Sequence, residues 1–119
     1  MNDMKIDNEN YSIEYLDNCN KVIFRGILRH RSIEEYDEIS NFLNRYAKNS
    51  EEYLIIDISN LSYINSSAIA SLCLFFIKIR NTGIKFKILA LKFVPWQNDL
   101  LSNLQHINEN IEIEYIIQH

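Results

Sequence analysis

The spacing of hydrophobic residues predicts alternating strands and helices along most of the chain. Two β-rich runs, Tyr11–Leu16 and Lys21–Leu28, flank a polar turn, a pattern that is typical of a hairpin. Hydrophobic side chains then recur every three or four residues over positions 32–47. Glu35 follows Ser32 at the spacing of a capping box, so we expect a helix that begins near Ser32.

The second half of the chain continues this alternation. The expected elements are a strand at Leu54–Ile58, a helix that begins at Asn65 or Ser66 and ends near Arg80, a strand at Ile84–Leu91, a helix that begins near Pro95, and a strand at Ile111–Ile117. The β-branched run Leu54–Ile58 is typical of a central strand that is covered on both faces.

The element order β-β-α-β-α-β-α-β predicts an α/β fold. Strands that alternate with helices over short loops form a mostly parallel central sheet with the helices packed on it. We expect residues 11–119 to form a single domain of this kind. Residues 1–10 are polar and acidic, so they are expected to form a flexible N-terminal tail.

Composition excludes several classes of function. The chain has 119 residues, 47% of them hydrophobic, and a formal net charge of −4, which argues against nucleic-acid binding. The most apolar run, Ala68–Ile77, is too short for membrane insertion, and Cys19 and Cys73 are expected to be reduced thiols in the cytoplasm. With two glycines and one proline, the chain lacks a glycine-rich phosphate loop. The histidines are not spaced as metal ligands, so we expect no metal, no cofactor and no enzymatic activity.

The chemistry that the sequence does offer is concentrated where the second helix begins. Backbone N–H groups at a helix start lack intrahelical partners and favour an anion, so a phosphorylated Ser66 would be stabilised there. The simpler interpretation is that Asn65 or Ser66 only caps the helix. Asp57 either holds this turn by hydrogen bonding or is a polar residue of the strand, and we favour the structural role.

The segment Leu54–Ile69 resembles the signature of STAS domains, the family of anti-sigma-factor antagonists. That signature reads apolar-apolar-Asp-apolar-Ser and then apolar-Asp-Ser-Ser/Thr-Gly-apolar, and its spacing agrees with this chain. The order of elements after residue 10 is similar as well. Phe24–Arg29 and Val94–Gln97 resemble a subgroup of small STAS-like bacterial regulators that share a Pro-Trp-Gln element.

The resemblance implies particular roles for the residues at this helix start. The family's phosphorylated serine corresponds to Ser66, and Ser67 is the neighbouring hydroxyl and the second candidate. Two positions depart from the family pattern, because Asn65 replaces the usual Asp and Ala68 replaces the usual Gly. The loss of the carboxylate eases repulsion of a phosphate but removes a group that a kinase can recognise.

The implied function is a non-enzymatic switch in bacterial partner-switching signalling. Its partners would be a GHKL-type serine kinase or anti-sigma factor, with a PP2C-type phosphatase that reverses the phosphorylation. Candidate contacts are Arg29, Arg31, Ile69 and Trp96, although Trp96 is more typical of an anchor packed on the sheet. The alternatives are a constitutive scaffold or activator of a signalling enzyme, and a sensor of a small ligand or anion. Whether the chain forms a weak homodimer stays open.

Overall fold

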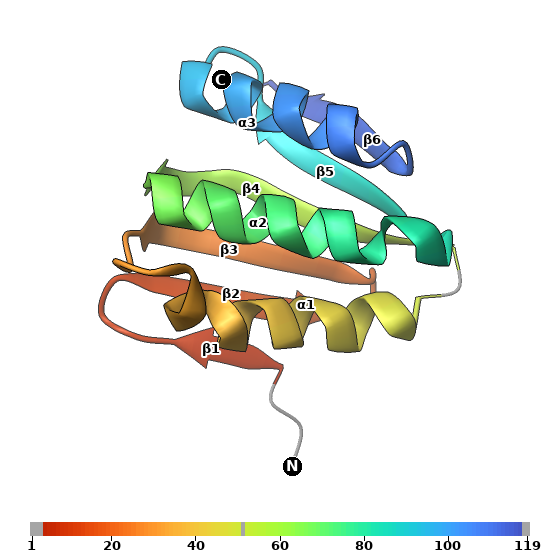
Figure 1. Cartoon of the computed structure of the whole chain (residues 1–119), viewed down its shortest axis with the longest axis horizontal. Coiled ribbons are helices and arrows are strands. Elements are labelled where there is room, and N and C mark those ends of the chain that lie inside the picture. The colour runs from red at the N-terminus through yellow and green to blue at the C-terminus, as the bar shows by residue number, and fades with distance from the viewer. Residues whose placement is uncertain (1–3, 51, 118–119) are drawn as a thin grey trace.

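Six strands form one sheet in the order in which they occur along the chain, in a computed structural model that describes residues 4–50 and 52–117 (Figure 1). The strands are β1 (Lys5–Asp7), β2 (Tyr11–Leu16), β3 (Lys21–Leu28), β4 (Tyr53–Ile64), β5 (Lys85–Leu91) and β6 (Ile111–Ile116). The helices are α1 (Asp37–Lys48), α2 (Ser66–Ile79) and α3 (Pro95–Ile107), with 3-10 turns η1 (Ile33–Tyr36) and η2 (Arg80–Thr82). This is the mixed α/β fold that the sequence predicts.

The connections place all three α-helices on one side of the sheet. Strands β1 to β3 are antiparallel, whereas β3 to β6 are parallel and are joined by crossovers that each contain a helix. Because each crossover moves to the next strand in the same direction and with the same hand, the helices share one face. Figure 1 shows them side by side in front of the sheet. The parallel strands therefore all end at the same edge, where α2 and α3 begin.

The core lies between the sheet and these helices. Alternate strand residues, including Phe24, Ile56 and Ile88, point into it. Leu54–Ile58 lies centrally between β3 and β5, as predicted, but helices cover only one of its faces. On the face without helices, Asp57 is flanked by Ile23 and Leu89, and these three residues are still buried.

Three further expectations differ from the structure. The proposed tail over residues 1–10 instead contains β1, which pairs with β2 at the sheet edge; residues 1–3 lie outside the described part. The first helix opens as the 3-10 turn η1, with Ser32 at its N-cap position, but the Ser32 hydroxyl caps no backbone amide and donates instead to the Glu35 carboxylate at 3.2 Å. The strand at Leu54–Ile58 continues to Ile64, because two register shifts, each with one extra residue in β4, keep β4 paired with β3.

Gly26 sits at one of these register shifts, with φ of +97°. A Cβ atom there would clash with the backbone carbonyl of Asn10 and approach the Cα atom of Tyr11. A side chain at position 26 would therefore suffer both backbone strain and a collision with the neighbouring strand.

None of the helices in the described part of the chain is long and apolar enough to cross a membrane.

We expect Gly26→Ala to lower the free energy of unfolding by at least about 2 kcal/mol, since strain and the backbone clash add. Gly83 is the matched control: its φ is +77°, and a Cβ atom would meet no neighbour within 4 Å. Gly83→Ala should cost only about 1 kcal/mol, the strain alone. Urea unfolding measures both values, and equal losses would contradict the close approach at Gly26.

Candidate functional site

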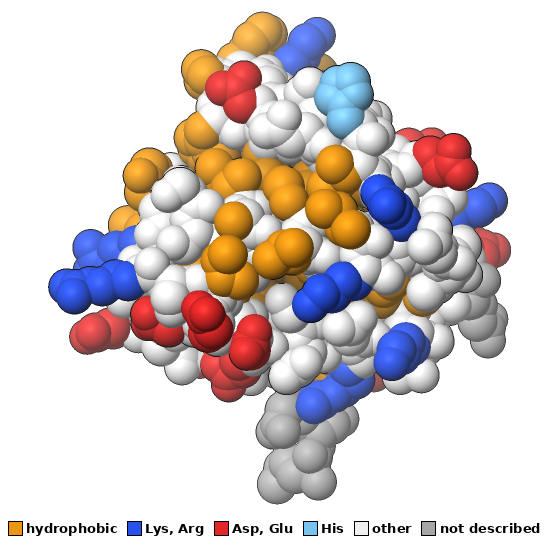
Figure 2. Space-filling model, viewed as in Figure 1, with side chains coloured by type: hydrophobic (Ala, Val, Ile, Leu, Met, Phe, Trp, Pro, Cys, Tyr) orange, Lys and Arg blue, Asp and Glu red, His pale blue; other side chains and the backbone are white. Residues whose placement is uncertain are grey.

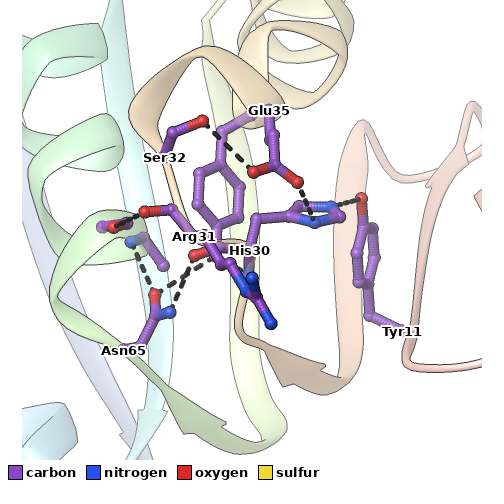
Figure 3. Close-up of polar contacts among 9 residues, drawn as sticks. Tyr11, His30, Arg31, Ser32, Glu35 and Asn65 are labelled. Carbon is purple, nitrogen blue, oxygen red and sulfur yellow. Dashed lines mark hydrogen bonds and ion pairs between the residues drawn. The ribbon is translucent and has the colours of Figure 1, made fainter.

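The side chain of Asn65 organises the start of α2. Its Oδ1 atom accepts a hydrogen bond from the Ala68 amide at 3.0 Å, which makes Asn65 the N-cap. Its Nδ2 atom donates to the His30 carbonyl in the loop after β3 at 2.8 Å. One amide therefore caps the helix and also ties it to the end of the neighbouring strand (Figure 3).

Tyr36 extends this network from beneath the loop. Its hydroxyl donates to Asn65 Oδ1 at 3.2 Å and accepts a hydrogen bond from the His30 amide at 2.8 Å. Burial raises the pKa of Tyr36, so the hydroxyl keeps the proton that it donates to Asn65 at neutral pH. The Asn65 cap, the His30 backbone and the core are thereby fixed relative to one another.

The two serines at the helix start differ in their hydrogen bonding. Ser67 Oγ donates to the Arg31 carbonyl at 3.1 Å, so this hydroxyl helps to hold the loop after β3. Ser66 is exposed, and within the described residues its hydroxyl makes no hydrogen bond. Ser66 is thus the more accessible acceptor, and its modification would break no hydrogen bond of the described structure.

The departures from the STAS pattern have a local physical explanation. An aspartate at position 65 could still accept from the Ala68 amide, but it could not donate to the His30 carbonyl. The asparagine therefore suits the loop that this chain places beside it. Ala68 is 1% exposed and belongs to the core cluster, so its methyl group is accommodated without an opening in the packing.

The outward face of α2 is apolar from Ala70 to Ile77, between Ser66 at its start and the exposed Lys78 near its end. The exposed Ser66 is the first residue of this face. Ala70, Cys73 and Ile77 follow it at helical spacing, and these three side chains are half-buried. Leu74, beside them, is 40% exposed. Figure 2 shows hydrophobic side chains gathered over the middle of the helical layer. We call Ser66 and these four apolar residues the α2 stripe.

The structure does not bring every candidate residue to the helix start. The Asp57 carboxylate accepts hydrogen bonds from the amide and hydroxyl of Ser59, at 2.9 and 2.6 Å, and none from residues 65–67. Its role is structural, the interpretation that the sequence favours, and it is not part of the loop. Ile69 is half-buried near the stripe, and Arg29 and Arg31 are exposed after β3.

The Pro-Trp-Gln element supplies hydrogen bonds to β4 and β5 beyond the point at which these two strands stop pairing. Trp96 is half-buried and packs against the core, as expected of an anchor. Gln97 is fully buried, with Oε1 accepting from the Leu91 amide at 2.8 Å and Nε2 donating to the Ile58 carbonyl at 3.2 Å. Its amide replaces ladder hydrogen bonds where β4 and β5 stop pairing. The motif alone did not reveal this role.

Sequence reasoning also missed the network around His30. The Tyr11 hydroxyl lies 3.0 Å from His30 Nε2, and His30 Nδ1 lies 3.3 Å from the Glu35 carboxylate. The sequence predicts Tyr11 in a strand and Glu35 in the capping box of a helix. Nothing in the spacing of these two residues links them to His30. Across residues 4–50 and 52–117, no three His, Cys, Asp or Glu residues are grouped as metal ligands would be.

The hydrogen bond from Asn65 to His30 can be tested by substitution. We expect Asn65→Asp to lower the free energy of unfolding by about 1–2 kcal/mol, because it removes a donor and places a carboxylate against a carbonyl oxygen. Asn103→Asp, at an exposed position of α3, is the control and should change stability by less than about 0.5 kcal/mol. Chemical denaturation compares the two, and an Asn65→Asp protein as stable as the wild type would contradict this role.

Comparisons with known proteins place these features in a family. The family model of the STAS domain matches residues 32–110. No curated protein matches the chain in sequence. Among solved structures, SiaC of Pseudomonas aeruginosa aligns with a TM-score of 0.70 at 14% identity, covering 98% of this chain and 100% of that one.

Two further structures share the fold. One is the diguanylate cyclase SiaD in complex with its activator SiaC, also from Pseudomonas aeruginosa, with a TM-score of 0.70 and 12% identity over 96% of this chain and 100% of the matched chain. The other is a protein of Thermotoga maritima described as an anti-sigma factor antagonist, with a TM-score of 0.54 and 16% identity over 89% of this chain and 86% of that one. Since the family model spans more than half of the residues, the resemblance seen in the motif is confirmed, and the chain belongs to the STAS domain family.

Proposed function

We propose that this chain is a non-enzymatic regulator that binds a signalling protein through the α2 stripe and is switched by phosphorylation of Ser66. The observation that carries the proposal is the position of Ser66, an exposed hydroxyl at the head of an outward apolar helix face. An apolar face of this length on a helix that is not covered from outside is typical of a protein contact.

Phosphate at Ser66 would act on the contact and leave the fold intact. The helix N-terminus stabilises an anion, because the Ser66 and Ser67 amides have no hydrogen-bond partner among the described residues and the helix dipole is positive there. A partner that packs on the α2 stripe would, however, have to desolvate a group of about −1.5 to −2 charges. Phosphorylation should therefore weaken binding while the domain stays folded.

The enzymes of the switch would be separate proteins. The STAS resemblance implies a GHKL-type serine kinase, which can itself be the anti-sigma-type partner, and a PP2C-type phosphatase. Ser67 is the less suitable acceptor, because its hydroxyl already donates to the Arg31 carbonyl.

A second candidate for the regulated partner is a diguanylate cyclase. SiaC, which shares this fold over nearly the whole chain, is described as the activator of the diguanylate cyclase SiaD and forms a complex with it. The fold shared with SiaC, with a TM-score of 0.70, and the complex that SiaC forms with a cyclase suggest this class of partner. If the partner is a diguanylate cyclase, the α2 stripe binds that enzyme, and phosphorylation of Ser66 ends the activation of the cyclase.

Substitutions at Ser66 distinguish a switch from a simple helix cap. Ser66→Asp should weaken partner binding at least about tenfold, since the carboxylate must be desolvated in the contact, whereas Ser66→Ala should keep full binding. The partner is first recovered from the native cells by cross-linking, and its affinity is then measured by calorimetry. Ser67→Ala is the control and should bind normally. If the wild type, Ser66→Ala and Ser66→Asp all bind equally, Ser66 is a cap and the switch is refuted.

The α2 stripe can be tested independently of Ser66. Leu74→Lys should abolish partner binding and leave the melting temperature unchanged within about 2 °C, because this side chain is 40% exposed. The matched control, Gln105→Lys on the exposed side of α3, adds the same charge away from the stripe. Normal binding by Leu74→Lys would show that the partner uses another surface.

A further inference from the structure

A small polar cavity opens at the edge of the sheet where β3 ends. It has a volume of about 210 Å³ and is lined by Asn10, Tyr11, Arg29, His30, Arg31 and Glu35. We call it the arginine pocket. Cavities that hold small organic ligands usually measure about 300–1,000 Å³ and are largely apolar, so this one suits a single polar side chain better than a metabolite.

The arginine pocket has two cations that the described residues do not neutralise. Its one carboxylate, on Glu35, is already engaged: Oε1 accepts from the Ser32 hydroxyl at 3.2 Å, and Oε2 lies 3.3 Å from His30 Nδ1. The Arg29 guanidinium donates only to the neutral amide of Asn10, at 3.0 Å. The Arg31 guanidinium makes no ion pair with a described residue and extends outward in Figure 3. These two arginines would match a carboxylate in charge and geometry.

Apolar side chains are exposed at the same end of the sheet. Tyr63, near the end of β4, is 52% exposed, and Phe93, just after β5, is 87% exposed. In Figure 2 hydrophobic side chains also lie along the left side of the molecule, where Figure 1 shows these strands ending. The end of the sheet at which the parallel strands finish therefore carries the cationic pocket and exposed aromatic side chains, two features that protein-binding surfaces combine.

We propose that the arginine pocket binds a carboxylate side chain, Asp or Glu, from the docking segment of the partner protein. Apolar residues next to that carboxylate pack on Tyr63 and Phe93. This inference rests on the proposed function, because it assumes a protein partner, and it adds the chemistry by which that partner is recognised. An anionic membrane is the weaker fit, because the cations line a concave pocket and the chain carries a net charge of −4.

The arginine pocket is also linked to the switch. The Ser67 hydroxyl and the Asn65 amide bind the Arg31 and His30 carbonyls, so the pocket loop is fixed to the helix start that carries Ser66. Because Ser66 directly precedes Ser67, a phosphate on Ser66 would add negative charge near this loop and weaken the attraction of the arginine pocket for the partner's carboxylate. This effect adds to the desolvation cost at the α2 stripe.

The test uses the full unphosphorylated chain and a random dodecapeptide display library as the probe. The enriched peptides should carry Asp or Glu beside apolar residues, and binding should shift the NMR signals of His30 and Arg31. Replacing the acidic residue of an enriched peptide by its amide should weaken binding about tenfold. Arg31→Glu should abolish binding of that peptide, whereas Arg80→Glu, a charge reversal at an exposed arginine of η2, should not.

Other outcomes overturn the inference. Enriched peptides without an acidic preference, or NMR shifts confined to the α2 stripe, would show that the arginine pocket is not the recognition site. Binding to phosphatidylserine vesicles that Arg31→Glu abolishes, without any peptide binding, would assign the surface to a membrane. Because these measurements do not involve Ser66 or its phosphorylation, failure of the switch leaves their result standing, and their failure leaves the Ser66 measurements intact.

Discussion

The amide of Asn65 is the contact on which the geometry of the site depends. It joins the first turn of α2, the loop after β3 and the buried Tyr36 hydroxyl through three hydrogen bonds. Loss of the donor would leave the Ser67 hydroxyl, which donates to the Arg31 carbonyl, as the remaining side-chain hydrogen bond from the helix start to this loop in the described structure. Asn65, one of the two residues that depart from the STAS motif, therefore fixes the candidate phosphorylation site to its surroundings.

The one-sided helical layer explains why α2 is exposed to a partner. The helix packs Leu72, Phe75 and Phe76 on the sheet, so its opposite side faces outward. A surface helix normally places polar residues there, whereas this helix has Ala70, Cys73 and Leu74. The same connectivity brings the start of α2 and the ends of the parallel strands to one edge, where Asn65 and Ser67 are hydrogen-bonded to the loop of the arginine pocket.

Local patterns predicted most of the fold. Periodicity identified the strands and helices from Tyr11 onward, and residue types placed the start and cap of α2 at Asn65 or Ser66; the structure makes Asn65 the cap and Ser66 the first residue. The short strand β1 was missed, because three residues with two charges carry no pattern and pair only through β2. Long-range contacts were also beyond the sequence: neither the bond from Asn65 to His30 nor the bridging role of Gln97 has a local signal.

The proposed function depends most on Ser66, because phosphate on this residue is expected to control partner binding while the domain stays folded. The most direct measurement compares the unmodified chain with the chain carrying phosphoserine at position 66, incorporated during translation. We predict a loss of partner affinity of at least about tenfold with an unchanged melting temperature and NMR spectrum of the core. Equal affinities for the two forms, or a phosphorylated chain that unfolds, would contradict it.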